Sequence, residues 1–184
     1  SQKINWASIS ISSDGKYQIA GNSSNNLLYS SSDYGYSWTT TTPGWGYTKT
    51  AMSSDGKYQT ITGLGNQIRV SSDYGKTWSI GRGAFAGCHS SISMSSDGKY
   101  QLATCNGSIV RSFNYGISGS WSESNAFGST DSAVSSDGKY QILAEMDGPI
   151  RVSSDYGITW TTSTSAGENA WSAVSISANG KYQT

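Results

Sequence analysis

The acidic side chains are the residues of this chain that could act as general acids, general bases or hard-metal ligands. Of the twelve Asp and Glu residues, four aspartates recur in one repeated motif and three in another. The others are Asp131, Asp147, Glu123, Glu145 and Glu168. No two of these acids have a sequence spacing that suggests a catalytic pair. A pair that the fold brings together from distant positions is the alternative. We therefore expect a protein that is not an enzyme.

The other reactive side chains are equally sparse. His89 is the only histidine, and although it follows Cys88, a solvated histidine is a stronger interpretation than a soft-metal site. The sequence contains no phosphate-binding glycine loop, no H-E-x-x-H motif and no G-x-S-x-G motif. We therefore expect neither a metal ion nor a cofactor.

The two cysteines, Cys88 and Cys105, flank a predicted hairpin whose turn is Asp97-Gly98. A two-residue turn there pairs positions whose numbers sum to 195, whereas the cysteines sum to 193, so they lie one diagonal step apart across the strands. Free, packed thiols are the preferred interpretation. A disulfide is the alternative if the turn is looser.

Charge and hydropathy exclude some partners. The chain has 12 Lys and Arg against 12 Asp and Glu, so it offers no electrostatic footprint for nucleic acid or for an anionic membrane surface. It has no apolar run near the length of a membrane span. The segment Ser1 to Trp6 contains neither an initiator Met nor a signal peptide, which is typical of a processed, trimmed or engineered chain.

Two motifs repeat with a common period. Gly-Lys-Tyr-Gln begins at Gly15, Gly56, Gly98, Gly138 and Gly180, at spacings of 41, 42, 40 and 42 residues. The pattern Ser-x-Asp-x-Gly-x-x-Trp has its acid position at Asp33, Asp73, Asn114 and Asp155, at spacings of 40, 41 and 41. A shared period of this length is typical of a unit of four short strands.

The second motif predicts a tight turn, which we call the Asp–Trp turn. Its carboxylate can accept backbone N–H bonds, its Gly can adopt a positive φ, and its Trp can close the turn as an apolar plug. The copy from Ser112 to Trp121 is degraded, with Asn in place of Asp and two extra residues before the Trp. The predicted structural positions are Asp33, Gly35, Trp38, Asp73, Gly75, Trp78, Asn114, Gly116, Trp121, Asp155, Gly157 and Trp160.

The first repeat predicts four strands, at Ala7 to Ser12, Lys16 to Gly21, Leu27 to Ser31 and Ser37 to Thr41. The turn Asp14-Gly15 joins the first two strands as a two-residue hairpin, and the Asp–Trp turn joins the last two. The residue two places before each hairpin acid is always serine, which predicts that the first strands crowd a central channel. These serines are Ser12, Ser53, Ser95, Ser135 and Ser177.

The Asp–Trp pattern resembles the Asp-box, or BNR repeat, of sialidase-like β-propellers. The near-identity of the units is similar to the propellers of giant DNA viruses, or to designs derived from them. The resemblance implies an all-β fold, a β-propeller with four-stranded antiparallel blades of about 41 residues, forming one segment over residues 1–184. The expected blades are 6–42, 47–81, 89–124 and 129–163, with a partial fifth at 171–184.

The number of units predicts self-association. Propellers have about four to eight blades, and closure of the ring protects the edges of the sheets. We therefore expect a homodimer in which two chains complete a ring of eight or nine blades. The alternative is a natural or engineered fragment that closes poorly.

The variable loops predict where a ligand would bind. In a propeller blade the hairpin and Asp–Trp turns share one face, so the less repetitive loops share the other. The aromatic and histidine candidates there are Trp6, Trp45, Tyr47, Phe85, His89 and Trp171. They suit stacking on sugar rings, and the alternative is that they wedge between neighbouring blades.

Three functions remain after these observations. The preferred hypothesis is a non-enzymatic binding or scaffold module for glycan or protein. The alternatives are a sialidase-like glycoside hydrolase and a purely structural or engineered assembly. Sialidases of this class use three arginines, a Tyr/Glu nucleophile pair and an Asp acid/base. Arg69 and Arg151 occupy equivalent repeat positions, and no position carries the catalytic set.

Overall fold

The computed structural model describes residues 5–24, 27–41, 47–63, 67–83, 90–105, 107–125 and 128–184. In these residues the regular structure is entirely β, and most of it lies in four antiparallel sheets of consecutive strands. We call these sheets blades 1 to 4. Strands such as Trp6–Ile11 and Ser91–Met94 alternate apolar and hydroxyl side chains, which suits a pleated strand whose successive side chains point to opposite faces of the sheet.

The strands of each blade follow the order of the chain. Blade 1 holds β1 (Trp6–Ile11), β2 (Gln18–Asn22), β3 (Leu28–Ser31) and β4 (Thr39–Thr41), and blade 2 holds β5 (Tyr47–Met52), β6 (Gln59–Gly63), β7 (Ile68–Ser71) and β8 (Ser79–Arg82). Blade 3 holds β9 (Ser91–Met94), β10 (Gln101–Cys105), β11 (Ser108–Ser112) and β12 (Trp121–Asn125). Blade 4 holds β13 (Ser129–Val134), β14 (Gln141–Glu145), β15 (Gly148–Ser153) and β16 (Thr161–Thr162).

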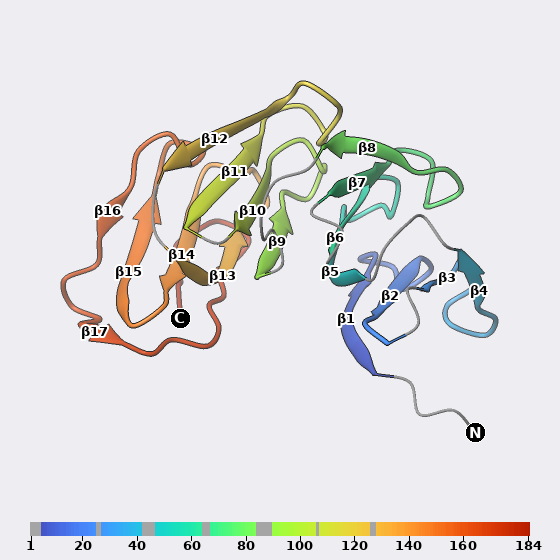
Figure 1. The fold of residues 1–184 in the computed structure, drawn as a ribbon, viewed down its shortest axis with the longest axis horizontal. Helices are drawn as coiled ribbons and strands as arrows, with labels where there is room; N and C mark the ends of the chain where they lie inside the picture. Colours follow the sequence, from blue (N-terminus) through green and yellow to red (C-terminus); the bar gives the residue numbers. More distant parts are fainter. Residues whose placement is uncertain are drawn as a thin grey trace.

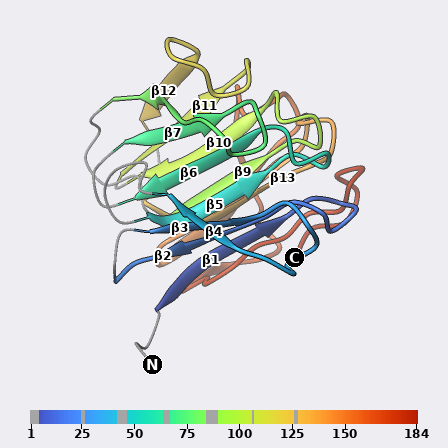
Figure 2. The ribbon, with the colours of Figure 1, turned by 90° about the vertical axis from the view of Figure 1, so that its right-hand side faces the viewer.

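The blades succeed one another along an arc, from blade 1 on the right of Figure 1 to blade 4 on the left. The first strand of each blade contacts the first strand of the next, and Figure 2 views the arc from the end formed by blade 1. First strands on the inside and fourth strands on the outside make this a β-propeller. The predicted fold class is therefore confirmed.

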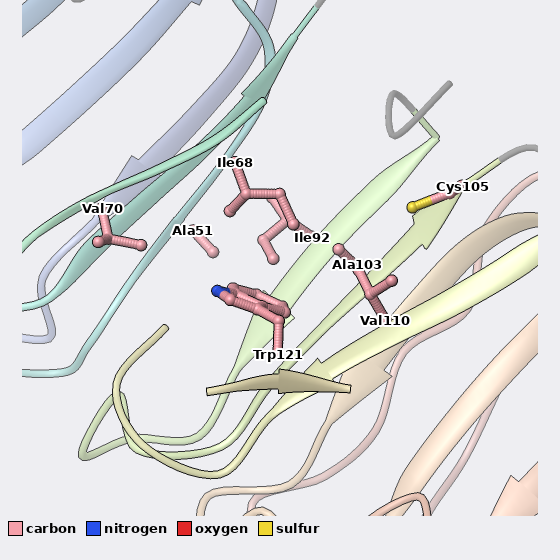
Figure 3. Close-up of a cluster of buried hydrophobic side chains, with 8 residues drawn as sticks. All are labelled: Ala51, Ile68, Val70, Ile92, Ala103, Cys105, Val110 and Trp121. Carbon is pink, nitrogen blue, oxygen red and sulfur yellow. The ribbon is translucent and has the colours of Figure 1, made fainter. Parts of the chain in front are cut away.

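Apolar clusters fill the spaces between the blades. The cluster in Figure 3 joins Ala51, Ile68 and Val70 of blade 2 to five residues of blade 3, with Trp121 only 8% exposed. Smaller clusters join blade 1 to blade 2 and blade 3 to blade 4. Each blade therefore depends on its neighbours for burial, as expected for a stack of repeats that cannot bury their faces alone.

The Asp-Gly hairpin differs from the predicted two-residue turn. The pairing of Ile11 with Gln18 has the expected register, but Gly15 N–H donates to Ser12 O at 2.9 Å, and Gly15 rather than Asp14 has a positive φ. Both common two-residue hairpin turns need a positive φ at the first central residue, which is Asp14 here. The chain therefore uses a four-residue loop that keeps the same register.

The serine that precedes this hairpin contributes a hydroxyl as well as a small volume. Ser12 Oγ donates to Asp14 Oδ1 at 2.6 Å and accepts from Tyr17 N–H at 2.9 Å. Ser53, Ser95, Ser135 and Ser177 repeat these contacts, the last with Asn179 in place of the acid. Caps of this kind satisfy turn N–H groups that would otherwise be unpaired.

The prediction of free thiols is wrong for Cys105, which is disulfide-bonded. Cys88, the other cysteine of the chain, lies outside the described residues. The hairpin register agrees with the predicted sum of 195, as Gln101 pairs with Met94. The prediction did not include the register shift at the other end of the first strand, which occurs in β1, β5 and β13. A β-bulge of this kind moves the pairing by one residue.

The fifth unit is partial, and we call residues 171–184 the half-blade. Its predicted strands, Trp171 to Ser177 and Lys181 to Thr184, are joined by the bridge between Ile176 and Gln183, by two backbone bonds between Ser175 and Thr184, and by the bond from Ser177 N–H to Tyr182 O at 2.8 Å. Val174, which is 9% exposed, packs with Ile142 and Ile150 of blade 4. The short β17 (Glu168–Asn169), which the sequence did not predict, pairs with β15.

Candidate functional site

The Asp–Trp turns are built around their carboxylates. Asp73 Oδ1 accepts from Ser71 Oγ at 2.8 Å and from Thr77 N–H at 2.9 Å, and its Oδ2 accepts from Thr77 Oγ1 at 2.6 Å. Asp33 and Asp155 repeat all three contacts. Charge-assisted bonds of this length are among the stronger hydrogen bonds in proteins. The carboxylate therefore holds both ends of the turn together.

The backbone of the turn explains its glycine and reveals a position that sequence reasoning missed. Gly75 has a φ of 79°, and Tyr74 before it has a φ of 64°. The left-handed region is uncommon for an aromatic residue, so a repeated Tyr in it needs a reason. Trp78 Nε1 donates to Gly75 O at 3.1 Å, so the indole closes the turn as predicted.

The degraded copy in blade 3 keeps the closure without the carboxylate. Ser112 Oγ lies 2.7 Å from Ser120 Oγ, which takes the place of the contact with the acid. Trp121 Nε1 still donates to Gly116 O, at 2.7 Å. Asn114 is exposed, and its side chain has no hydrogen bond among those found for the described residues. The two extra residues of this copy therefore let a serine hydroxyl replace the acid.

These contacts change the acidity of the turn carboxylates. The Ser37 hydroxyl, followed by the Ser37 N–H and the Ser31 hydroxyl, lowers the pKa of Asp33 below its ordinary value. At Asp73, partial burial raises the pKa, but the hydroxyl and N–H of Thr77 outweigh it and the net pKa is lowered. Hydrogen bonds that favour the ionised form always act in this direction. The turns are therefore most stable with their acids ionised.

Both kinds of turn lie on the same face of each blade, as predicted. Tyr34 N–H donates to Lys16 O at 3.1 Å, which links the Asp–Trp turn of blade 1 to its hairpin. Tyr74, Tyr115 and Tyr156 make the equivalent bond in blades 2 to 4. The repetitive face is therefore held together by its own backbone.

A backbone ladder runs from blade to blade along this face. Ser13 N–H donates to Ser54 O at 2.8 Å, and Ser54 N–H donates to Ser96 O at 2.8 Å. The series continues from Ser96 to Ser136 and from Ser136 to Ala178, each at 2.9 Å. Every bond points from one blade to the next. The ladder therefore has a donor end at Ala178 and an acceptor end at Ser13.

Tyrosine pairs explain the positive φ in the Asp–Trp turns. Tyr17 of the blade 1 hairpin stacks on Tyr74 of the blade 2 turn, with ring centroids 4.7 Å apart. The pairs Tyr58–Tyr115 and Tyr100–Tyr156 repeat this at 4.4 and 4.6 Å. The left-handed backbone thus aims each turn tyrosine at the preceding blade. Tyr34 of blade 1 is 58% exposed and has no stacked partner among the described residues.

The back face of blade 1, which looks away from blade 2, is an exposed apolar surface. It forms a groove of about 720 Å³ lined by residues of three strands and the following turn: Trp6, Ala7, Ser8, Ile9, Ala20, Tyr29 and Trp38. Ile9 is 66% exposed and Trp38 is 40% exposed. The equivalent residues Ile92 and Trp121, which a preceding blade covers, are 7% and 8% exposed. The groove therefore corresponds to a surface that lies between two blades elsewhere in the arc.

The predicted ligand-binding residues are not brought together in the described part of the chain. Trp6 lies edge-on to Tyr29 at 4.9 Å in the groove of blade 1. Trp171 follows blade 4 and donates from Nε1 to Gly148 O at 3.1 Å, packed against the blade 4 cluster. Tyr47 begins β5, but its side chain lies outside the described residues, as do Trp45, Phe85 and His89.

Three of the five acids outside the repeats are engaged in structural contacts. Glu123 pairs with Arg82 at 3.0 Å, and Glu145 pairs with Arg151. Asp131 accepts from Ser91 Oγ at 2.8 Å and from Val174 N–H at 3.0 Å, so it joins blade 4 to blade 3 and to the half-blade. Across the described ranges no cluster of three or more His, Cys, Asp or Glu side chains could hold a metal ion.

Comparisons with known proteins find a structural likeness only. No family model matches the sequence, and no curated protein matches it. The GH74 enzyme of Niastella koreensis is similar over 85% of this chain and 24% of its own, at 23% identity and a TM-score of 0.69. U3-55K is similar over 88% and 52%, at 12% identity and a TM-score of 0.70. Hydrazine synthase of Kuenenia stuttgartiensis is similar over 97% and 54%, at 17% identity and a TM-score of 0.69.

These likenesses support the propeller fold and nothing finer, because every identity is below a quarter. The chain spans between 24% and 54% of the length of these proteins. No helix in the described part of the chain is long and apolar enough to cross a membrane.

Proposed function

We propose that this chain is a non-enzymatic propeller scaffold of the Asp-box type that assembles with a second copy into a closed ring of eight or nine blades. The observation that carries the proposal is the polarity of the inter-blade contacts. The ladder presents a free acceptor at Ser13 and a donor at Ala178, and the back face of blade 1 is apolar and exposed. A heterologous contact that repeats the same rotation generates a ring.

The energy available from closing the back face supports association. Burial of an aliphatic or aromatic side chain stabilises by about 1.5–3 kcal/mol. Ile9 and Ile11 are 66% and 56% exposed, and Trp38 is 40% exposed. The equivalent positions in blades 2 to 4 are buried or partly buried, so a neighbouring blade would cover this surface in the same way. A second copy of the chain supplies such a blade.

For the face opposite the Asp–Trp turns we propose recognition of glycan or protein. Trp6 is 55% exposed and rests against Tyr29, but it also lines the groove that the second copy would cover, so this aromatic platform is open to a sugar ring only in the unassembled chain. The packed state of Trp171 instead supports a role between blades for that residue. A glycan array with the wild-type chain and a Trp6→Ala variant tests the idea, since a hit that survives the substitution refutes a role for Trp6.

The sialidase-like hydrolase remains the alternative function. The ion pairs of Glu123 and Glu145 and the bonds of Asp131 support a non-enzymatic role, because these acids hold strands together. Turnover of a fluorogenic sialoside that is abolished by Asp147→Asn or Glu145→Gln would overturn our ranking. The close similarity of the repeats further supports a recent duplication or a design, as in the giant-virus propellers.

Light scattering at several concentrations tests the ring directly. A chain mass of 19.5 kDa makes the expected species twice that mass. A monodisperse monomer at every concentration would refute the assembly. A glycan-array result without hits, together with a sharp dimer, would leave a structural role alone.

A further inference from the structure

We infer that blade 1 of one copy seats directly on blade 4 of the other and displaces the half-blade from it. This inference rests on the proposed ring and specifies its junction. The half-blade and the partner's blade 1 are then alternative occupants of the same surface, the forward face of blade 4. That face contains Ile142 and Ile150, which the half-blade now covers.

Three contacts recur at each junction between full blades. The first is the ladder bond between hairpins. The second is the close approach of a hairpin glycine to the preceding tyrosine, since a Cβ at Gly56 would lie 2.6 Å from the ring of Tyr17. The third is the stacked pair formed by that tyrosine and the tyrosine of the next Asp–Trp turn. These contacts surround the apolar cluster, in which a turn Trp joins the back face.

The half-blade makes only part of this set with blade 4. It provides the ladder bond from Ser136 to Ala178 and the close approach of Gly180 to Tyr140. It contains no Asp–Trp turn, so Tyr140 has no stacked tyrosine among the described residues. Blade 1 of a second copy offers every contact, because it brings Ser13 O, Gly15, Tyr34 and Trp38 to the same surface.

The exposed side of the half-blade offers fewer apolar contacts to blade 1 than blade 4 does. The residue equivalent to Ile19 there is Thr184, and no strand equivalent to β3 provides a counterpart of Leu28. Ile19 and Leu28 are fully buried where blade 1 meets blade 2. Tyr182, at 67% exposed, could stack on Tyr34, but Ile9, Ile11 and Trp38 would face hydroxyl groups and water. Burial of apolar surface therefore favours blade 4 over the half-blade.

Cross-linking between engineered cysteines distinguishes the two junctions. The double variants Tyr34→Cys/Tyr140→Cys and Tyr34→Cys/Tyr182→Cys are treated with a short bis-maleimide, with the three single variants and the wild-type chain as controls. We expect a covalent dimer from the 34/140 variant and none from the 34/182 variant. A covalent dimer from 34/182 alone, or from neither variant while light scattering shows a dimer, overturns this inference and leaves the ring proposal standing. A monomer mass overturns both.

Hydrogen exchange of the wild-type chain tests the same point without substitutions. Amides of the half-blade, including those of Ser175 and Thr184, should exchange faster in the concentrated dimer than in the diluted chain. Amides in β1 should exchange more slowly on association, which shows that the back face is covered. Slower exchange of the half-blade in the dimer would show that it stays in place and would overturn the displacement.

Discussion

The carboxylate of the Asp–Trp turn can be tested inside this one chain, because blade 3 contains a copy without it. Asp73 accepts three hydrogen bonds from Ser71 and Thr77, whereas the side chain of Asn114 is exposed and makes none of these contacts. The matched substitutions Asp73→Ala and Asn114→Ala therefore remove the same number of side-chain atoms. They differ in the bonds that they break.

The magnitude follows from the bonds that are left unpaired. Asp73→Ala leaves the Thr77 N–H and two hydroxyl groups without their acceptor, and unpaired groups of this kind cost about 1–3 kcal/mol. Water reaches this partly exposed turn and keeps the cost toward the lower end of that range. Asn114→Ala should change the free energy of unfolding by no more than about 0.5 kcal/mol. Urea titration followed by tryptophan fluorescence measures both. Equal shifts of the two midpoints would refute the role of the carboxylate.

The pH dependence provides a second measurement on the same pair. The folded-state pKa of Asp73 is lowered, so its contribution is complete above the unfolded pKa of about 3.9 and is lost as the pH falls through the lower folded value. The stability of the wild-type chain should therefore fall toward that of Asp73→Ala in acid, and the two urea midpoints should converge as the pH falls through the lowered folded-state pKa of Asp73. Asn114→Ala should remain parallel to the wild-type chain over the whole range. A constant difference between wild type and Asp73→Ala at all pH values would contradict the assignment.

Three other pairs of substitutions test the packing. Trp78→Ala should lower the free energy of unfolding by about 3–5 kcal/mol, because it leaves a cavity at the junction of blades 1 and 2. Trp38→Ala should cost less in the monomer, since Trp38 is 40% exposed. Equal losses in thermal unfolding would contradict this. Gly81→Ala should lower the free energy of unfolding by about 1–3 kcal/mol, because the new Cβ would lie 2.3 Å from Gly116 O. Gly83→Ala is the control, since its Cβ would meet no atom within 4 Å. Equal shifts of the two urea midpoints would show that this steric clash does not matter. Thr60→Val should lower the free energy of unfolding by about 1–3 kcal/mol, because it removes the hydroxyl that donates to Gln101 Oε1 at 2.8 Å. Thr62→Val should be neutral or stabilising, because the Thr62 hydroxyl has no partner within the described part of the chain. A larger loss for Thr62→Val in the same assay would show that the bond to Gln101 does not stabilise the fold.

The sequence predicts the repeat and its strands because both signals are local. A Gly with positive φ and a Trp with a fixed offset identify a turn from its own residues. The hairpin register followed from the same kind of reasoning, although the loop has a different form. The bulge at Trp6 and Ser8 was not predicted, because no Gly or Pro marks it.

The contacts between blades could be inferred only in part, because they join residues about 41 positions apart. The repeated Tyr in Ser-x-Asp-Tyr-Gly was visible in the sequence, but its stacking on the hairpin Tyr of the preceding blade requires the structure. The hydrogen bonds of the buried glutamines also depend on residues of the preceding blade, so the sequence did not predict them. Gln101 finds a donor in Thr60, whereas Gln59 and Gln141 face Ile19 and Leu102 at the equivalent position, and their Oε1 atoms have no partner in the described ranges.

The two outer surfaces of the arc differ in polarity, which also supports the ring. Stacked repeats that remain soluble end in units with a polar outer face. The exposed side of the half-blade is polar and ends in Tyr182, Gln183 and Thr184. The back face of blade 1 is the opposite, since the apolar side chains of Ile9, Ile11 and Trp38 are 66%, 56% and 40% exposed there. An exposed apolar surface of this kind costs solubility unless another blade covers it. Replacing Ile9 and Ile11 by Thr should therefore leave the fold intact and abolish the dimer in light scattering, and a dimer that persists would show that this face does not form the junction.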